Sequence, residues 1–126
     1  MSWQSYIDTN LVGSGRINKA AILGLQGGVW AASAGYTLSA EEQKAIVNAF
    51  SNPSTVMASG LKLAGKKFLG LRATEDSIYL KQGGSGAVLR KTKQAVLVGE
   101  YEPPTQAGEA TPIVENLGDY LVSTGY

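Results

Sequence analysis

The sequence contains no cysteine and no histidine, and each absence removes a class of chemistry. Without cysteine the chain forms no disulfide bond, which favours a cytoplasmic location. Without histidine it lacks the commonest general base and the commonest metal ligand, and every histidine-dependent catalytic triad is excluded. We therefore expect a protein that is not an enzyme and that uses no metal and no cofactor.

Long hydrophobic runs are missing as well. No segment approaches the roughly 18 consecutive apolar residues that a membrane-spanning helix requires. The start of the chain shows no basic region followed by an apolar stretch, as a secretory signal would. The 126 residues are 44% hydrophobic and 17% charged, which is the balance of a soluble globular protein. We expect one domain over residues 1–126, with no internal repeat and no linker.

The net charge of +1 hides an uneven distribution of charge along the chain. Residues 1–61 hold three basic and three acidic side chains, whereas residues 62–93 hold eight basic and two acidic ones, a net charge of +6. Residues 94–126 hold five acidic side chains and no basic one, a net charge of −5. Solvated strands and a solvated helix would explain this pattern, and so would a basic patch that meets an anionic partner.

Local signals predict three helices. Ser2 is a suitable N-cap for a first helix that runs to about Leu11, before the Gly-Ser-Gly sequence at 13–15. Residues 39–42 (SAEE) match a capping box that starts a second helix, which ends near Pro53 and is followed by a loop to residue 60. Apolar residues at helical spacing carry the chain to its last residue: Ile113, Val114, Leu117, Tyr120 and Leu121.

Elsewhere the apolar residues alternate with a period of two, which is typical of strands. Residues 17–23 and 29–32 indicate a hairpin, and five later runs indicate consecutive strands at 61–63, 67–73, 77–82, 87–92 and 95–101. The links between the later runs are too short for parallel crossovers, so neighbouring strands should be antiparallel. The predicted fold class is α+β, built on a single central antiparallel β-sheet, and the terminal helices are free to pack together on one of its faces.

Half of the ten aromatic residues occupy unusual places in this layout. They lie at the ends of elements or beside glycine-rich turns, and they comprise only tryptophan and tyrosine: Trp3, Tyr6, Trp30, Tyr120 and Tyr126. Each has an apolar ring and one hydrogen-bond donor, which suits a surface that is dry in its middle and wet at its edge. Such a set fits a polyproline II ligand, whose rings stack on aromatic faces and whose carbonyls accept hydrogen bonds. Ordinary packing between helix and sheet is the alternative.

Several segments resemble profilins. The opening residues 2–8 (SWQSYID) are similar to the N-terminal signature of that family. The resemblance extends over the whole chain through VWA at 29–31, FLGLR at 68–72, SIY at 77–79, KTKQ at 91–94, AGEA at 107–110 and GDYL at 118–121. Length and strand order are similar to those of the short profilins of fungi. The resemblance implies that the N- and C-terminal helices pack side by side on one face of the sheet, with a further helix on the other.

The resemblance also implies a function, which is actin-monomer binding in the cytoplasm and cytoskeleton. A protein of this kind regulates actin polymerisation and promotes nucleotide exchange on actin. It also binds proline-rich segments of formins and other actin regulators, and it binds phosphoinositides; no nucleic-acid partner is expected. The aromatic set named above would carry polyproline binding. A polyproline-binding adaptor with little or no actin affinity is the alternative.

The residues that match the family's actin surface fall in two groups. One lies on the later strands and comprises Arg72, Lys81, Arg90, Lys91 and Lys93. The other lies at the start of the last helix and comprises Gln106, Gly108, Thr111, Glu115 and Asn116. Cationic side chains would steer association with an acidic partner. Four of them could also bind a phosphoinositide headgroup, in competition with actin: Arg72, Lys81, Arg90 and Lys91.

Pro112 departs from the family pattern. The last helix of profilins begins near the position of Ala107, which would place this proline inside it, without an N–H and against the preceding turn. Read locally, Thr111 is a good N-cap and Pro112 a good first helical residue. We therefore expect the regular helix to start at Pro112 or to kink there. Either outcome would affect the actin-facing positions Gln106 and Gly108.

Overall fold

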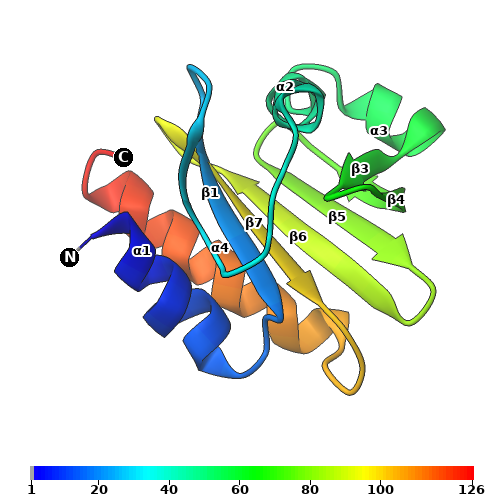
Figure 1. Cartoon of the computed structure of the whole chain (residues 1–126). Coiled ribbons are helices and arrows are strands. Elements are labelled where there is room, and N and C mark those ends of the chain that lie inside the picture. Colours follow the sequence, from blue (N-terminus) through cyan, green and yellow to red (C-terminus); the bar gives the residue numbers. More distant parts are fainter. Residues whose placement is uncertain (1) are drawn as a thin grey trace.

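A seven-stranded antiparallel sheet runs through the computed structural model, which describes residues 2–126 (Figure 1). The strand order is β2-β1-β7-β6-β5-β4-β3, so the first hairpin lies at one end of the sheet and the hairpin β3–β4 at the other. The strands are β1 (Lys19–Gly24), β2 (Val29–Ala32), β3 (Leu61–Leu63), β4 (Lys66–Ala73), β5 (Ser77–Gln82), β6 (Ser85–Lys91) and β7 (Ala95–Tyr101).

Helical segments cover both faces of this sheet. The N-terminal segment consists of α1 (Trp3–Ser5), the π-helix η1 (Tyr6–Leu11) and the 3₁₀ turn η2 (Val12–Ser14). It lies beside the long C-terminal helix α4 (Ala107–Ser123) on one face, whereas α2 (Ala40–Ala49) and α3 (Pro53–Ser59) lie on the other (Figure 1). The predicted fold class and the pairing of the terminal helices are confirmed.

Side-chain alternation along the central strands fills two cores, one on each face. In β1, Ala20 and Ile22 pack under the terminal helices, whereas Ala21 and Leu23 pack under α2 and α3. On the first face these strands bury residues of both terminal helices, including Leu11 from the start of the chain and Leu121 from its end. Fully burying one such side chain contributes about 1.5–3 kcal/mol, so the two ends of the chain are held firmly against the sheet.

The N-terminal segment starts as predicted and then winds differently. The Ser2 hydroxyl accepts a hydrogen bond from the Ser5 N–H at 3.1 Å, which makes Ser2 the N-cap. From Tyr6 onward the turns widen to a π-helix, and the Val12 N–H donates to the Ile7 carbonyl five residues earlier. A wider turn of this kind is rare and often accompanies a functional site.

Two sequence predictions about helices are wrong. Residues 53–59 form the helix α3 and no loop, because Pro53 starts this helix, where its missing N–H costs nothing. The last helix starts at Ala107, so the expected start at Pro112 is also wrong. The Glu109 carboxylate accepts a hydrogen bond from the Gln106 N–H there at 3.0 Å, and an ion pair joins Glu109 to Arg16 from the start of the chain. The kink at Pro112 stays a prediction.

One buried polar pair lies on the α2 side of the sheet. Glu100 on β7 and Tyr36, in the segment between β2 and α2, are 3% and 5% exposed. Within residues 2–126, neither the Tyr36 hydroxyl nor the Glu100 Oε2 has a hydrogen-bond partner. Burial raises the pKa of Glu100, and the neighbouring Tyr36 hydroxyl, followed by Lys66 and Lys19, only partly opposes this shift. Among the helices of the same described part of the chain, none is long and apolar enough to cross a membrane.

Candidate functional site

Four aromatic side chains from the two ends of the chain meet Trp30 of the first hairpin. Trp3 is their centre: its ring centroid lies 4.7 Å from that of Trp30, 5.6 Å from Tyr6 and 5.2 Å from Tyr126. Tyr6 in turn lies 6.4 Å from Tyr120. Each ring pair of this kind stabilises the structure by about 0.5–1.5 kcal/mol beyond the area it buries. The structure thus brings together all five residues of the predicted set, which we call the aromatic cluster.

The aromatic cluster is open to solvent. Trp30, Tyr120 and Tyr126 are 37%, 50% and 44% exposed, and Trp3 and Tyr6 are half-buried. Partial burial, together with the neighbouring Tyr120 phenol, raises the pKa of Tyr6, so this hydroxyl stays protonated and can donate a hydrogen bond at neutral pH. The cluster offers both ring faces and donors to a ligand, which packing within a closed core would not do.

Three residues that sequence reasoning missed hold the aromatic cluster in place. The carbonyl oxygen of Tyr126 accepts a hydrogen bond from the Thr92 hydroxyl at 2.7 Å, and the Gln94 side chain donates to the neighbouring Gly125 carbonyl at 3.0 Å. Gly24 makes room for Trp30, since a Cβ atom there would lie 2.5 Å from the indole Nε1. The KTKQ sequence at 91–94 contained the first two, but only the fold shows what they contact.

A shallow cavity of about 360 Å³ continues from the aromatic cluster between the terminal helices. Tyr6 and Tyr120 form one part of its wall, and Asn10 and Asn116 contribute amide groups to the rest. The predicted actin-facing residue Asn116 therefore lies beside the aromatic cluster rather than among the basic residues of the sheet.

A second candidate surface lies at the other end of the sheet. Arg72 on β4 and Lys81 on β5 are exposed, and Lys81 pairs across the strands with Leu69. Leu69 and Leu71 are 66% and 52% exposed, a large apolar area that the sequence analysis did not single out. Such exposure beside cations is typical of a protein–protein contact surface. The alternation of side chains along β4 was the available signal. Only one face of this strand is buried, so Leu69 and Leu71 on its other face are exposed.

Lys81 and the start of α4 border one hollow. Its volume is about 560 Å³, and Leu71, Lys81, Tyr101, Thr105 and Gln106 are among the residues that line it. Gly108 is exposed and Thr111 half-buried in the following turn of α4. The fold therefore places Gln106 near Lys81, as the predicted actin surface requires.

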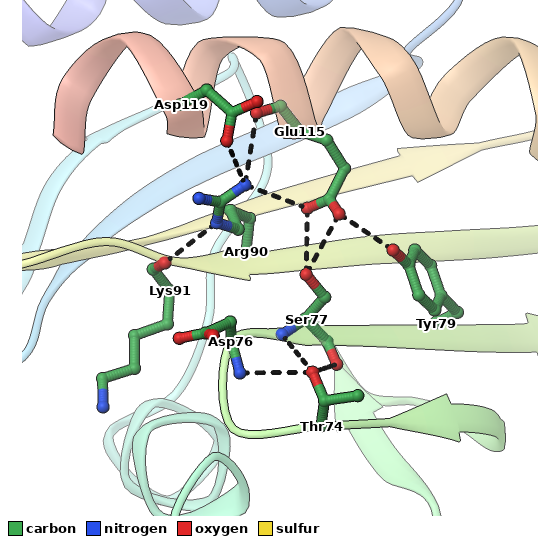
Figure 2. Close-up of polar contacts among 8 residues, drawn as sticks. All are labelled: Thr74, Asp76, Ser77, Tyr79, Arg90, Lys91, Glu115 and Asp119. Carbon is green, nitrogen blue, oxygen red and sulfur yellow. Dashed lines mark hydrogen bonds and ion pairs between the residues drawn. The ribbon is translucent and has the colours of Figure 1, made fainter. Parts of the chain in front are cut away.

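Arg90 and Glu115 belong to a polar network between α4 and the sheet, shown in Figure 2. The Arg90 Nη1 lies 2.9 Å from Asp119 Oδ1 and 3.7 Å from Glu115 Oε1. Ser77 and Tyr79 donate hydrogen bonds to the Glu115 carboxylate at 3.0 and 2.9 Å. Burial, and then the hydrogen bond to Glu115, raise the pKa of the Tyr79 hydroxyl, which keeps it a donor. The Arg90 side chain is only 16% exposed, so the fold itself uses much of its charge.

The side chains of Lys91 and Lys93 remain apart from that network. Lys91 points away from Arg90 in Figure 2, and Lys93 lies in the turn between β6 and β7. Lys93 directly follows Thr92, whose hydroxyl bonds Tyr126, so Lys93 lies toward the aromatic cluster. Arg72 and Lys81 lie on β4 and β5, whereas Trp30 lies on β2 at the far end of the sheet. The surface around Arg72 and Lys81 is therefore separate from the aromatic cluster. Within residues 2–126, no three acidic side chains gather closely enough to hold a metal ion.

Comparison with known proteins accounts for the fold. The family model described as Profilin matches residues 1–126. Profilin-1A of Acanthamoeba castellanii and the profilin of Saccharomyces cerevisiae are each 46% identical to the chain, over the full length of both proteins. A crystal structure of A. castellanii profilin II covers 99% of this chain and all of its own, with a TM-score of 0.96 and 42% identity. Mouse profilin IIa in complex with a double repeat from the FH1 domain of mDia1 matches with a TM-score of 0.83 at 25% identity, with both chains fully covered. The chain belongs to the profilin family.

Proposed function

We propose that the protein binds monomeric actin through the Arg72–Lys81 end of its sheet and proline-rich segments through the aromatic cluster. Profilins are actin-binding regulators and not enzymes. The observation that carries the proposal is the aromatic cluster, whose four ring contacts join both ends of the chain while three of its five rings stay exposed.

The aromatic cluster has the chemistry that a polyproline II segment requires. Such a segment has no internal hydrogen bonds, so its carbonyls are free to accept from the indole N–H of a tryptophan and the phenol of a tyrosine. Its proline rings pack on aromatic faces, and the preformed helix loses little entropy on binding. The mouse profilin bound to an FH1 repeat supports a formin segment as the ligand.

The opposite end of the sheet combines charge with apolar area. Arg72 and Lys81 provide exposed positive charge, and Leu69 and Leu71 provide apolar surface that a partner would bury. Cations speed association with an acidic partner and make it sensitive to salt. We infer that actin binds here, that a more open state of actin is stabilised and nucleotide exchange thereby promoted, and that the protein regulates actin polymerisation in the cytoplasm.

Phosphoinositides are the third proposed ligand. Their phosphate groups would meet the same basic residues that actin would cover, namely Arg72, Lys81, Arg90 and Lys91. Each lysine or arginine near an anionic membrane surface contributes about 1 kcal/mol. Actin and the lipid headgroup would then compete, so membrane binding would release actin.

Two substitutions test the separation of the surfaces. Trp3→Ala removes the centre of the aromatic cluster and should abolish retention on immobilised poly-L-proline while leaving actin binding intact. Arg72→Glu should weaken actin binding, measured by fluorescence titration at several salt concentrations, and leave polyproline retention intact. Lys44→Glu is the matched control, because Lys44 is an exposed cation on α2, on the other face of the sheet.

Two results would contradict this arrangement. If either folded variant lost both activities, the two surfaces would not be independent. If the wild-type protein gave no actin response at low salt but still bound polyproline, the adaptor function would replace actin binding.

A further inference from the structure

Asp119 forms the most exposed contact of Arg90 in the network between α4 and the sheet (Figure 2). The Arg90 Nη1 bonds Asp119 at 2.9 Å, and its Nε donates to the Lys91 carbonyl at 3.1 Å. The Arg90 Nη2 donates no hydrogen bond to any residue from 2 to 126. The guanidinium therefore has a donor group to spare beside a carboxylate that water can reach.

The two carboxylates that face Arg90 are held with unequal strength. Glu115 is 23% exposed and also accepts hydrogen bonds from Ser77 and Tyr79, which keep it in place. Asp119 is 68% exposed and has no contact other than Arg90 among the ion pairs and side-chain hydrogen bonds of the described residues. An exposed ion pair of this kind is worth about 0.2–1 kcal/mol. Asp119 is the partner that Arg90 can exchange at low cost.

The aliphatic part of Arg90 does not need to move in such an exchange. It lies against Gly118, where a Cβ atom would come within 2.5 Å of the Arg90 Cγ. Gly118 thus allows the arginine to pass closely under α4 and hold its guanidinium at the edge of the helix. Only the Asp119 side chain has to rotate away.

A hollow of about 510 Å³ adjoins this guanidinium. Its lining residues are Asp76, Arg90, Lys91, Thr92, Lys93 and Val122. Within residues 2–126 neither lysine forms an ion pair. Three cations around a space of this size favour a compact, multiply charged anion such as a phosphate monoester. A broad protein surface would meet the exposed Asp119 carboxylate before it reached the largely covered arginine.

We propose that Asp119 is an internal competitor for Arg90, which an incoming phosphate group displaces while Glu115 keeps the arginine positioned. This proposal rests on the proposed phosphoinositide binding, which Asp119 would weaken. In the free protein the Asp119 carboxylate is bound to the Arg90 guanidinium, so a weakly charged anion gains little binding free energy there. A phosphorylated inositol headgroup carries enough charge to replace Asp119 and to engage the lysines of the hollow at the same time.

The variant Asp119→Asn tests the competition, because it removes the charge and keeps the shape of an exposed side chain. We expect it to bind inositol 1,4,5-trisphosphate about two- to fivefold more tightly than the wild-type protein, because the ligand no longer has to break an exposed ion pair. Phosphatidylcholine vesicles with and without phosphatidylinositol 4,5-bisphosphate provide the second arm. An equal gain in both arms assigns the site to the phosphorylated headgroup, whether free or in a membrane.

A double-mutant cycle separates competition for Arg90 from a general change of charge. In an Arg90→Gln background, Asp119→Asn should give no gain, since the contested group is gone. Asp76→Asn is the matched control, because Asp76 lines the same hollow without touching the guanidinium. An undiminished gain in the Arg90→Gln background, or an equal gain from Asp76→Asn, would overturn the proposal.

Other outcomes separate this proposal from the one on which it rests. If the wild-type protein binds the phosphate probes and Asp119→Asn changes nothing, the competitor is disproved and phosphoinositide binding stands. If neither protein binds any phosphate probe at low salt, phosphoinositide binding fails and the competitor with it. A gain seen for actin alone would also overturn the proposal, because the competing ligand would then be a protein surface.

Discussion

The substitution Gly24→Ala should disable the aromatic cluster without removing any of its rings. The new Cβ atom would lie 2.5 Å from the Trp30 Nε1 and 2.9 Å from its Cε2, whereas ordinary contact begins near 3.4 Å. The indole must therefore retreat by about 0.9 Å from a position in which it lies 4.7 Å from Trp3. The backbone at Gly24 is not left-handed, so alanine itself adds no strain there.

Two energies set the size of the effect. Forcing one extra methyl group into a packed site costs about 1–3 kcal/mol of stability. A ligand that needs Trp30 beside Trp3 would have to restore that arrangement, at a cost of about 0.5–1.5 kcal/mol, and the upper end corresponds to about tenfold weaker binding. We therefore expect Gly24→Ala to remain folded, to unfold at a lower temperature and to bind polyproline about tenfold less tightly.

Retention on immobilised poly-L-proline and a titration of tryptophan fluorescence would measure this loss. The matched control is Gly108→Ala, the same substitution at a position where the Cβ atom has open space, and it should bind polyproline like the wild-type protein. Actin binding should be unchanged in Gly24→Ala. If folded Gly24→Ala bound polyproline with wild-type affinity, the position of Trp30 would not matter and the role we assign to the aromatic cluster would be refuted.

Two further predictions concern stability. The pKa of Glu100 is raised above its ordinary value of 4.5, so the folded state favours the protonated carboxyl. The stability that comes from this protonation is present below the pKa of the unfolded chain, and it is lost as the pH rises through the pKa of the folded protein. Glu100→Gln should match the wild-type protein at acid pH and be the more stable of the two at neutral pH in urea unfolding, and parallel pH profiles would contradict this reasoning. Pro112→Ala restores an N–H that can donate to the Gly108 carbonyl and should raise the free energy of unfolding by about 1–3 kcal/mol. An unchanged thermal midpoint for Pro112→Ala would show that the helix already accommodates the proline without cost.

Local signals in the sequence predicted the elements whose cause is local. The hydroxyl of Ser2 and the capping box of Ser39 with Glu42 act over three residues, and the structure has both. Short links between alternating segments predicted antiparallel neighbours, and all six strand pairs are antiparallel. The start of α4 was missed although the Gln106 N–H bonds the Glu109 carboxylate only three residues away, because Thr111 followed by Pro112 is the stronger local signal for a helix start. The ion pair from the distant Arg16 to Glu109 could not be read from local signals.

The residues of the candidate surfaces also divide into those that local sequence features indicated and those whose roles only the fold reveals. The composition and placement of the aromatic residues indicated the aromatic cluster, since tryptophan and tyrosine at the ends of elements are typical of a binding surface with a dry middle and a wet edge. Gly24 and Thr92 were not predictable, because their roles depend on which ring and which carbonyl the completed sheet brings to them. Arg90 was predicted to face a partner because it matches the family's actin surface, and that reasoning had no means of finding the two carboxylates on α4.

The contact between Trp3 and Tyr126 couples ligand recognition to the folding of the entire domain. Their rings lie 5.2 Å apart although they stand at opposite ends of the described chain, so this pair requires both terminal helices to be packed on the folded sheet. A partly folded chain has no such pair and offers nothing to a ligand that needs both rings. A ligand at a hundred times its dissociation constant would therefore stabilise the whole molecule by about 2.7 kcal/mol. Melting curves recorded with and without a proline-rich peptide would report occupancy of this site directly.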